Sequence, residues 1–341
     1  MNQSPLAPMG VGKLLDRSFT VYRQHFGAFF LLALMLFGPF LLLQDLLVFD
    51  IGNLSFFMQD TDGSDFWESV ASRFAGMDTE PTDKIGFLLL YLLVVLPVMG
   101  LGAYPQLVSS TLLMTRAAVE GQTLGIKAAL KQSMGRFWPL VGATVVYSLV
   151  IVGIVLAFVL LFGLLALIVT LISGESLGSI FDGDDAVVSA LFIMLFIVAY
   201  LIFIVLIMLV PGFFMLRWGF YLPYVLLEGG GVPLGKSWNL TKGNFWRLFG
   251  LYVVLVVLYS VFSGGVQVAV YGLLGASILS QLLMLLFSCV LMPWMMIVYS
   301  LAYLDLRVRK DGTDLMAMLE KQAGHETATP HVEEGPGVSH E

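Results

Sequence analysis

The sequence predicts an all-α polytopic membrane protein with six transmembrane helices in three repeated pairs, each pair preceded by a cytoplasmic interfacial amphipathic helix. Apolar residues make up 58% of the 341 positions and charged residues only 12%, whereas a soluble domain carries about 25% charged residues. Mean hydropathy is +0.91. Charge-free stretches of the length that crosses a bilayer alternate with segments that carry the positive charge, and together these observations exclude a water-soluble fold.

The charge-free stretches place the spans. They are Phe26–Gln44, Ile85–Thr115, Phe137–Ser173, Ala186–Leu216 and Leu248–Leu304. The last stretch is long enough for two crossings, divided between Ser263 and Gln281, so the simplest count is six spans. The stretch from Phe137 exceeds the thickness of the bilayer core at about 1.5 Å per residue. It therefore either tilts and projects outward or breaks near Gly153 or Gly163.

The distribution of charge predicts the orientation of the spans. With six spans, 15 of the 17 Lys and Arg residues lie on the side that holds both termini, and only Arg73 and Lys84 lie on the other. That other side holds 13 of the acidic residues. Basic residues near span ends remain cytoplasmic. We therefore expect both termini in the cytoplasm and the acidic loops outside.

Three segments before the first span of each pair share one spacing. In each, an aliphatic residue is followed four positions later by a large apolar residue and eleven positions later by the Phe that begins a span. These segments are Leu15–Phe26, Ile126–Phe137 and Leu234–Phe245. Offsets of 4 and 11 fall on one helical face, and the Lys and Arg residues lie mostly off it. Each segment is therefore predicted to be a basic amphipathic helix in the cytoplasmic membrane interface.

The ends of the second spans also recur. Each is followed by an acidic residue and a glycine, in Glu120-Gly121, Glu228-Gly229 and Asp311-Gly312. We therefore predict repeat units at about 11–121, 122–230 and 231–312, with chance similarity as the alternative.

The domain limits follow from these units. The six-span membrane domain covers residues 11–323 and closes with a terminal amphipathic helix over 313–323. Residues 1–10 form an N-terminal cytoplasmic segment. Residues 324–341 are rich in Pro, Gly and Glu, a composition typical of a disordered cytoplasmic tail.

Residues that could carry catalysis or bind a metal do not form a pattern. No pair of the four histidines has metal-ligand spacing, and the chain has no phosphate-binding glycine loop or Ser/His/Asp set. Asp182, Asp184 and Asp185 could hold a divalent cation, but they lack the EF-hand spacing, so a solvated acidic loop is favoured. The single cysteine, Cys289, lies inside an apolar run. We expect no enzymatic activity, no cofactor, no metal and no nucleic acid partner.

Two groups of residues are candidates for a site. Prolines inside the second spans could break helices and form a substrate region, or only kink helices whose freed carbonyls are satisfied by neighbours, which we favour. These prolines are Pro97, Pro105, Pro211 and Pro293. Arginines near the span ends are candidate contacts for the headgroups of anionic lipids. These arginines are Arg17, Arg23, Arg136, Arg217, Arg247, Arg307 and Arg309.

Three segments resemble a bacterial membrane family. They are LLDRSFTVYRQHFGAFF (Leu14–Phe30), LLEGGGVPLGKSWNLTKGNFWRLFG (Leu226–Gly250) and YLDLRVRKDGTDL (Tyr303–Leu315). They are similar to the membrane domain attached to some glycerophosphodiester phosphodiesterases, which also occurs as stand-alone proteins. The catalytic part of that family is a soluble barrel with paired histidines and metal-binding carboxylates. This chain has no matching His-Arg-Gly motif, so the resemblance transfers no catalytic residue.

These observations together define what we expect of the protein. It is expected in the bacterial cell (inner) membrane as a multi-pass, non-enzymatic module that scaffolds or regulates a protein partner in the membrane, or senses lipid. One alternative is a transporter or carrier of an uncharged or lipid-like substrate that uses the proline-broken spans. Another is a non-catalytic membrane partner of a glycerophosphodiester phosphodiesterase.

Overall fold

The computed structural model describes residues 9–48, 81–173, 186–229, 233–275 and 277–326. Over these ranges the chain forms helices joined by turns, with no strand. Six segments are long and apolar enough to cross a membrane: Phe26–Leu47, Ile85–Val119, Phe137–Leu165, Ile197–Leu227, Phe245–Leu274 and Ile278–Gly312. The predicted fold class, an all-α polytopic membrane protein with six spans, is confirmed.

The first pair of spans contains two turns of π-helix. Its elements are α1 (Val11–Gln24), α2 (Phe26–Val48), α4 (Pro81–Leu90), η2 (Tyr91–Val95), α5 (Leu96–Val98), η3 (Met99–Ala103) and α6 (Tyr104–Val119). The two π-helical turns, η2 and η3, lie directly before α5 and α6, which contain Pro97 and Pro105 near their first residues. Proline has no N–H to donate and crowds the preceding turn, so a wider turn accommodates it within a continuous span.

The second pair consists of two long helices that run side by side. Its elements are α7 (Ile126–Met134), α8 (Phe137–Ser173), α10 (Ala186–Trp218) and α11 (Tyr221–Leu227). Helix α8 is 37 residues long and passes through Gly153 and Gly163 without a break. The expectation of a break near Gly153 or Gly163 is therefore wrong, because a glycine alone does not interrupt the helical hydrogen bonds, and a tilted helix that projects from the bilayer stays a prediction.

The third pair ends in the longest helix. Its elements are α12 (Pro233–Thr241), α13 (Phe245–Leu274) and α14 (Ile278–Glu326). After α13 the chain turns at Gly275, whose φ of 53° favours glycine. Gly121 and Gly229 also have positive φ, whereas Gly312 remains helical. For this reason α14 continues past its acidic-glycine pair.

This continuation differs from the sequence prediction. The segment predicted as a separate helix, 313–323, is part of α14, which also includes residues 324–326 of the predicted disordered tail. The rest of that tail, 327–341, and residues 1–8 of the N-terminal segment lie outside the described residues.

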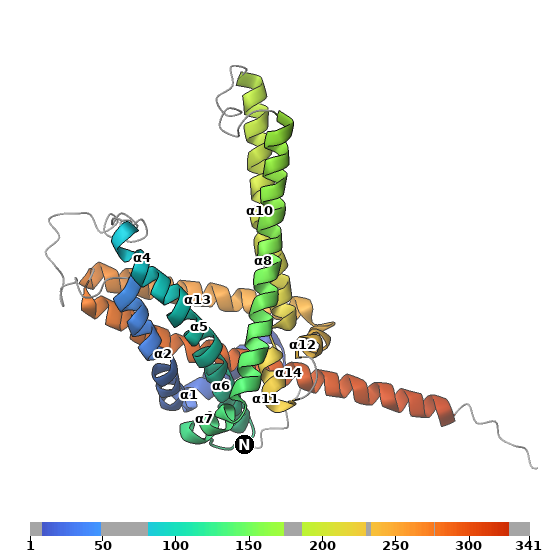
Figure 1. Ribbon diagram of the computed structural model, residues 1–341. Coiled ribbons are helices and arrows are strands. Elements are labelled where there is room, and N and C mark those ends of the chain that lie inside the picture. The colour runs from blue at the N-terminus through green and yellow to red at the C-terminus, as the bar shows by residue number, and fades with distance from the viewer. Residues whose placement is uncertain (1–8, 49–80, 174–185, 230–232, 276, 327–341) are drawn as a thin grey trace, which may run out of the picture.

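The C-terminal parts of the three second spans meet in a packed region that we call the hub. It consists of residues 103–114 of η3 and α6, 220–227 at α11, and 294–306 of α14. The spans extend from the hub as arms, and the α8–α10 hairpin stands away from the others, while α2 packs against α14 (Figure 1). Residues Pro105–Thr115 of α6 are all buried. A helix covered on every side in this way lies at the centre of the hub.

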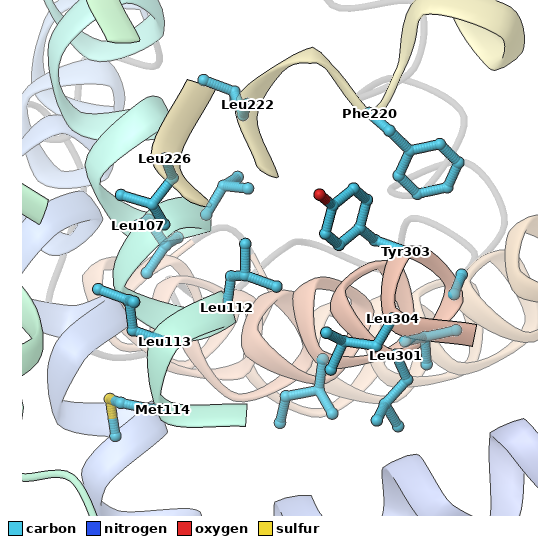
Figure 2. Packing of buried hydrophobic residues seen from close by; sticks show 14 of the residues in the cluster. Leu107, Leu112, Leu113, Met114, Phe220, Leu222, Leu226, Leu301, Tyr303 and Leu304 are labelled. Atoms are coloured by element: carbon cyan, nitrogen blue, oxygen red, sulfur yellow. The ribbon is translucent and has the colours of Figure 1, made fainter. Parts of the chain in front are cut away.

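One equivalent position from each unit lies in the hub. Leu112, Phe220 and Tyr303 each stand eight residues before the acidic residue that follows their span. Their exposures are 0%, 0% and 1%, and Figure 2 shows all three in the same packed cluster. The spacing that suggested three units in the sequence therefore also selects three core residues.

Candidate functional site

The short helices dock on the hub in a cyclic order. Helix α1 packs on α14, α7 packs on α6, and α12 packs on α10 and α11. Each short helix thus contacts the second span of the unit before it, and the first contacts that of the last.

Each docking contact includes a buried polar bond. The Nε1 of Trp294 donates to the Oγ of Ser18 at 3.2 Å. The hydroxyl of Ser133 donates to Oε1 of Gln106 at 2.5 Å, and the backbone N–H of Phe220 donates to the Oγ of Ser237 at 3.1 Å. Hydrogen bonds of this kind fix the register of each short helix against its span.

The most deeply buried positions of the short helices lie next to the predicted apolar face. Ser18, Ala129 and Ser237 occupy equivalent positions and are at most 1% exposed. On the predicted face, Leu15, Ile126 and Leu234 also pack against the core, and Phe19 stacks on Trp294 with ring centres 4.7 Å apart while it remains 47% exposed. Small side chains allow the close approach of helix to helix, so the larger apolar residues of the predicted face are only partly covered by protein.

A buried carboxylate joins the N-terminal segment to the third pair of spans. Asp305 is 1% exposed. Its Oδ2 lies 2.6 Å from Nη2 of Arg247 and 3.0 Å from Nε of Arg309, and its Oδ1 accepts the backbone N–H of Met9 at 2.6 Å. Both arginines also donate to the Met9 carbonyl. Arg247 and Arg309, predicted as lipid contacts, therefore hold this network together.

Arg217 lies among aromatic rings. Its guanidinium carbon is 4.9 Å from the centre of the Trp238 ring and 5.4 Å from those of Phe213 and Phe245. Its Nε and Nη1 are buried and have no hydrogen-bond partner among the described residues. Attraction of the cation to the ring faces takes the place of those bonds.

Three more of the candidate arginines occupy different settings. Arg23 is exposed on α1, and Nη1 of Arg17 lies 3.7 Å from the Met9 sulfur. Nη1 of Arg136 donates to the Val225 carbonyl at 2.8 Å. The Arg136 side chain also lies where a Cβ on Gly229 would stand, so the close approach and the positive φ of Gly229 both require glycine there.

Three of the four candidate prolines are buried, and Pro97 is half-buried. One turn before Pro293, the Tyr22 hydroxyl donates to the Val290 carbonyl at 2.5 Å. Burial raises the pKa of Tyr22 to about 12, so the hydroxyl keeps the proton that it donates. A neighbouring side chain thus bonds a carbonyl in the turn before Pro293, although the carbonyl that Pro293 leaves without its helical partner is that of Cys289, and the role of the prolines stays a prediction.

Polar atoms without partners lie along α6, after Pro105. The described residues offer no hydrogen bond to Nε2 of Gln106 or to four buried hydroxyls. The hydroxyls belong to Ser109, Ser110, Thr111 and Thr115. Elsewhere, buried hydroxyls such as that of Thr144 donate to a carbonyl of their own helix. Buried polar groups normally have a partner, so this helix has unused capacity to bind a polar group.

Two cavities flank α11 where it meets α12. The polar cavity, of about 430 Å³, is lined by Tyr224, Glu228, Lys236, Tyr303, Arg307, Lys310 and Asp311, among others. Arg307 lies 3.8 Å from Glu228 and 4.0 Å from Asp311. These ion pairs are long and partly exposed, so each contributes little stability and an incoming anion could replace either.

The apolar cavity, of about 460 Å³, lies on the other side of Tyr224. Its lining includes Arg136, Pro139, Gly142, Ala143 and Val146 at the start of α8, with Val225 and Leu234 opposite. Arg136 is the charged residue in the lining of this cavity. Of the predicted arginines, Arg136 and Arg307 therefore line cavities; neither cavity is lined by any of the four candidate prolines.

Sequence reasoning missed Lys236, Lys310 and Tyr224 as cavity residues. The two lysines belong to the general excess of positive charge on one side, and Tyr224 carries no charge. Nothing in their local spacing shows that α12 and the end of α14 come together beside α11, so only the packing of the three units identifies them.

The fold defines a multi-pass helical membrane protein, with two cavities beside its hub. The chain belongs to the family described as Domain of unknown function (DUF7847), whose model matches residues 86–306. No curated protein matches the chain, and no solved structure does. The family match provides no link to glycerophosphodiester phosphodiesterases, so that resemblance stays a prediction.

Proposed function

We propose that this protein is a non-enzymatic membrane module that binds anionic lipid at its hub and passes the bound state on to a protein partner. The observation that carries the proposal is the polar cavity, whose lining holds three cations, Lys236, Arg307 and Lys310, against two carboxylates, Glu228 and Asp311. Cations at that depth attract anionic headgroups with about 1 kcal/mol each. Because the cyclic docking connects all three units, a ligand there touches the second and third units at once.

The test removes two cations from the polar cavity. We expect the double variant Lys236→Gln, Arg307→Gln to bind phosphatidylglycerol roughly 30-fold more weakly than the wild type, since about 2 kcal/mol is lost. Binding is measured by native mass spectrometry and by titration of phosphatidylcholine nanodiscs with phosphatidylglycerol. The matched control is Lys127→Gln, Lys131→Gln, which removes the same charge from α7. Equal binding by the two variants would contradict the proposal.

We also propose that the hub faces the cytoplasm of a bacterial cell. The excess of Lys and Arg on that side supports this orientation. Single cysteines in a Cys289→Ala background test it: Lys242→Cys lies on the hub side, and Leu273→Cys, 76% exposed, lies at the far end of α13. An impermeant thiol reagent added to intact cells should label only Leu273→Cys. Labelling of Lys242→Cys alone would show the opposite orientation and contradict the proposal.

A carrier of an uncharged or lipid-like substrate is the second candidate. The observation that favours it is the run of unpartnered polar atoms in α6, directly after the π-helical turns at Pro97 and Pro105. Broken helices with free polar groups form substrate sites in transporters. If α6 lines a hydrated path, Ser110→Cys should react with a small water-soluble thiol reagent, while Leu112→Cys on the same helix should not. No reaction at either position would remove the carrier hypothesis.

A further inference from the structure

The start of α8 carries a stripe of residues that changes from charged to apolar along the helix. Arg136, Pro139, Gly142 and Val146 follow one another at spacings of three or four residues, so they lie on one helical face. All four line the apolar cavity. Ten residues of helix correspond to about 15 Å. The stripe therefore begins with a cation just before the span and continues as an apolar surface into it.

The apolar cavity beside this stripe has the volume and the lining expected of a site for an apolar chain such as an acyl group. A Cβ added to Gly142 would meet nothing within 4 Å, so the helix surface is recessed there. The opposite wall comes from Val225 of α11 and Leu234 of α12. At about 460 Å³, the cavity falls in the size range of ligand sites, which are mostly apolar with a few oriented polar groups.

The two cavities share one residue. Tyr224, which is half-buried on α11, lines both the apolar and the polar cavity. An occupant that extends past Tyr224 would meet cations on one side and apolar groups on the other. Arg136 lines the apolar cavity and uses one of its five N–H donors on the Val225 carbonyl.

We infer that the ligand is an anionic lipid whose acyl chain lies in the apolar cavity along α8 and whose headgroup reaches past Tyr224 into the polar cavity. This inference rests on the proposed function and specifies its ligand as one amphiphile bound by both cavities. A soluble phosphate would use only the polar cavity. The position of Gly142 and Val146 inside a candidate span favours a ligand that enters from the bilayer.

The experiment fills the apolar cavity and leaves the polar cavity unchanged. Gly142→Leu places a side chain in the recess, and the matched control is Gly153→Leu, farther along the same helix, where a Cβ also meets nothing. Leucine raises helix propensity at both positions. The probe is phosphatidylglycerol with a photoreactive acyl chain, presented to the full chain in phosphatidylcholine nanodiscs.

We expect Gly142→Leu to lower crosslinking of the acyl chain to α8, α11 and α12 by about tenfold, because the leucine side chain displaces several methylene groups of the lipid from the cavity. Gly153→Leu should behave as the wild type. Should Gly142→Leu elute as aggregate, Val146→Trp fills the same stripe, with Val152→Trp as its control. These valines are 51% and 61% exposed, so each tolerates a larger side chain.

The outcomes separate the inference from the proposal beneath it. If Lys236→Gln, Arg307→Gln lowers phosphatidylglycerol binding while Gly142→Leu equals Gly153→Leu, the inference is overturned and the proposed function stands. If the wild type does not distinguish phosphatidylglycerol from phosphatidylcholine, both are overturned. If inorganic phosphate or glycerol phosphate competes as strongly as the lipid, the acyl chain contributes nothing to binding, and the inference again fails.

Discussion

The α8 span of the hairpin is more apolar than the α14 span that ends in the hub, yet it is the less buried of the two. No residue is buried in the most apolar part of the hairpin span Phe137–Leu165. In the span Ile278–Gly312, a third of the corresponding part is buried. The hub includes serines, threonines and an ion-paired aspartate. The hairpin span of α8 holds large aliphatic side chains that are exposed, such as Leu149 and Leu160, and the hairpin itself stands away from the other spans (Figure 1).

The difference teaches that hydropathy alone does not identify a protein core here. Apolar side chains in the hairpin need a solvent that accepts them, and a bilayer is that solvent. In the hub, protein covers the helices on every side, so close packing and internal polar bonds hold them. The same kind of substitution should therefore have opposite consequences in the two regions.

The largest expected effect is at the centre of the ionic network. Asp305→Ala should lower the free energy of unfolding by about 3–5 kcal/mol, because it leaves Arg247 and Arg309 without their shared carboxylate. Thermal unfolding in mild detergent measures the loss. The control Asp311→Ala removes a carboxylate that is 73% exposed, where ion pairs contribute at most about 1 kcal/mol. Similar melting of both variants would contradict the structural role of Asp305.

A matched leucine pair tests the comparison directly. Leu112 in the hub is fully buried, whereas Leu160 in the hairpin is 63% exposed. Leu112→Ala should cost about 2–5 kcal/mol, since it opens a cavity, and Leu160→Ala should change the melting temperature little in the same detergent. An equal loss at Leu160 would mean that another protein surface covers the hairpin.

Insertion of a charge tests whether hydrocarbon surrounds the hairpin. Leu160→Lys should disfavour membrane insertion by about 3 kcal/mol, and Leu160→Ile, which adds no charge at the same position, should not. Glycosylation-reporter assays of the α8–α10 segment measure the inserted fraction. Normal insertion of Leu160→Lys would place this part of α8 in water.

The smallest effect concerns the contact within the hairpin. The rings of Phe162 and Phe203 stack with centres 4.2 Å apart, and such pairs contribute about 0.5–1.5 kcal/mol. Phe162→Leu should raise hydrogen exchange in α8 and α10 without changing exchange in α6 or α14. Faster exchange in the hub as well would show that the two regions unfold together.

The sequence correctly predicted what depends on local composition. Charge-free length is a direct measure of whether a helix can cross hydrocarbon, so the six spans and the helical class followed from counting. The short helices before each pair were also found at Ile126 and near Leu15 and Leu234. Their membrane location, the basic side and the repeat stay predictions. Cyclic docking and the equivalence of Leu112, Phe220 and Tyr303 support the repeat.

The sequence could not assign roles to individual arginines. All seven share a place near span ends, but Arg247 and Arg309 neutralise Asp305, Arg217 lies on aromatic rings, and Arg307 lines the polar cavity. An arginine near a span end gives the same sequence pattern whether its partner is a lipid, a carboxylate or an aromatic ring. Its role depends on groups far away in the chain, such as Met9 for Arg309.

The sequence by itself determined the number and the apolar character of the spans, because these follow from side-chain hydropathy and backbone hydrogen bonding within a segment. Only the tertiary structure decided which residues of each short helix meet protein, and that α8, α11, α12 and α14 line two cavities that share Tyr224. Those features come from contacts between units about a hundred residues apart, and no local pattern encodes a distance between them.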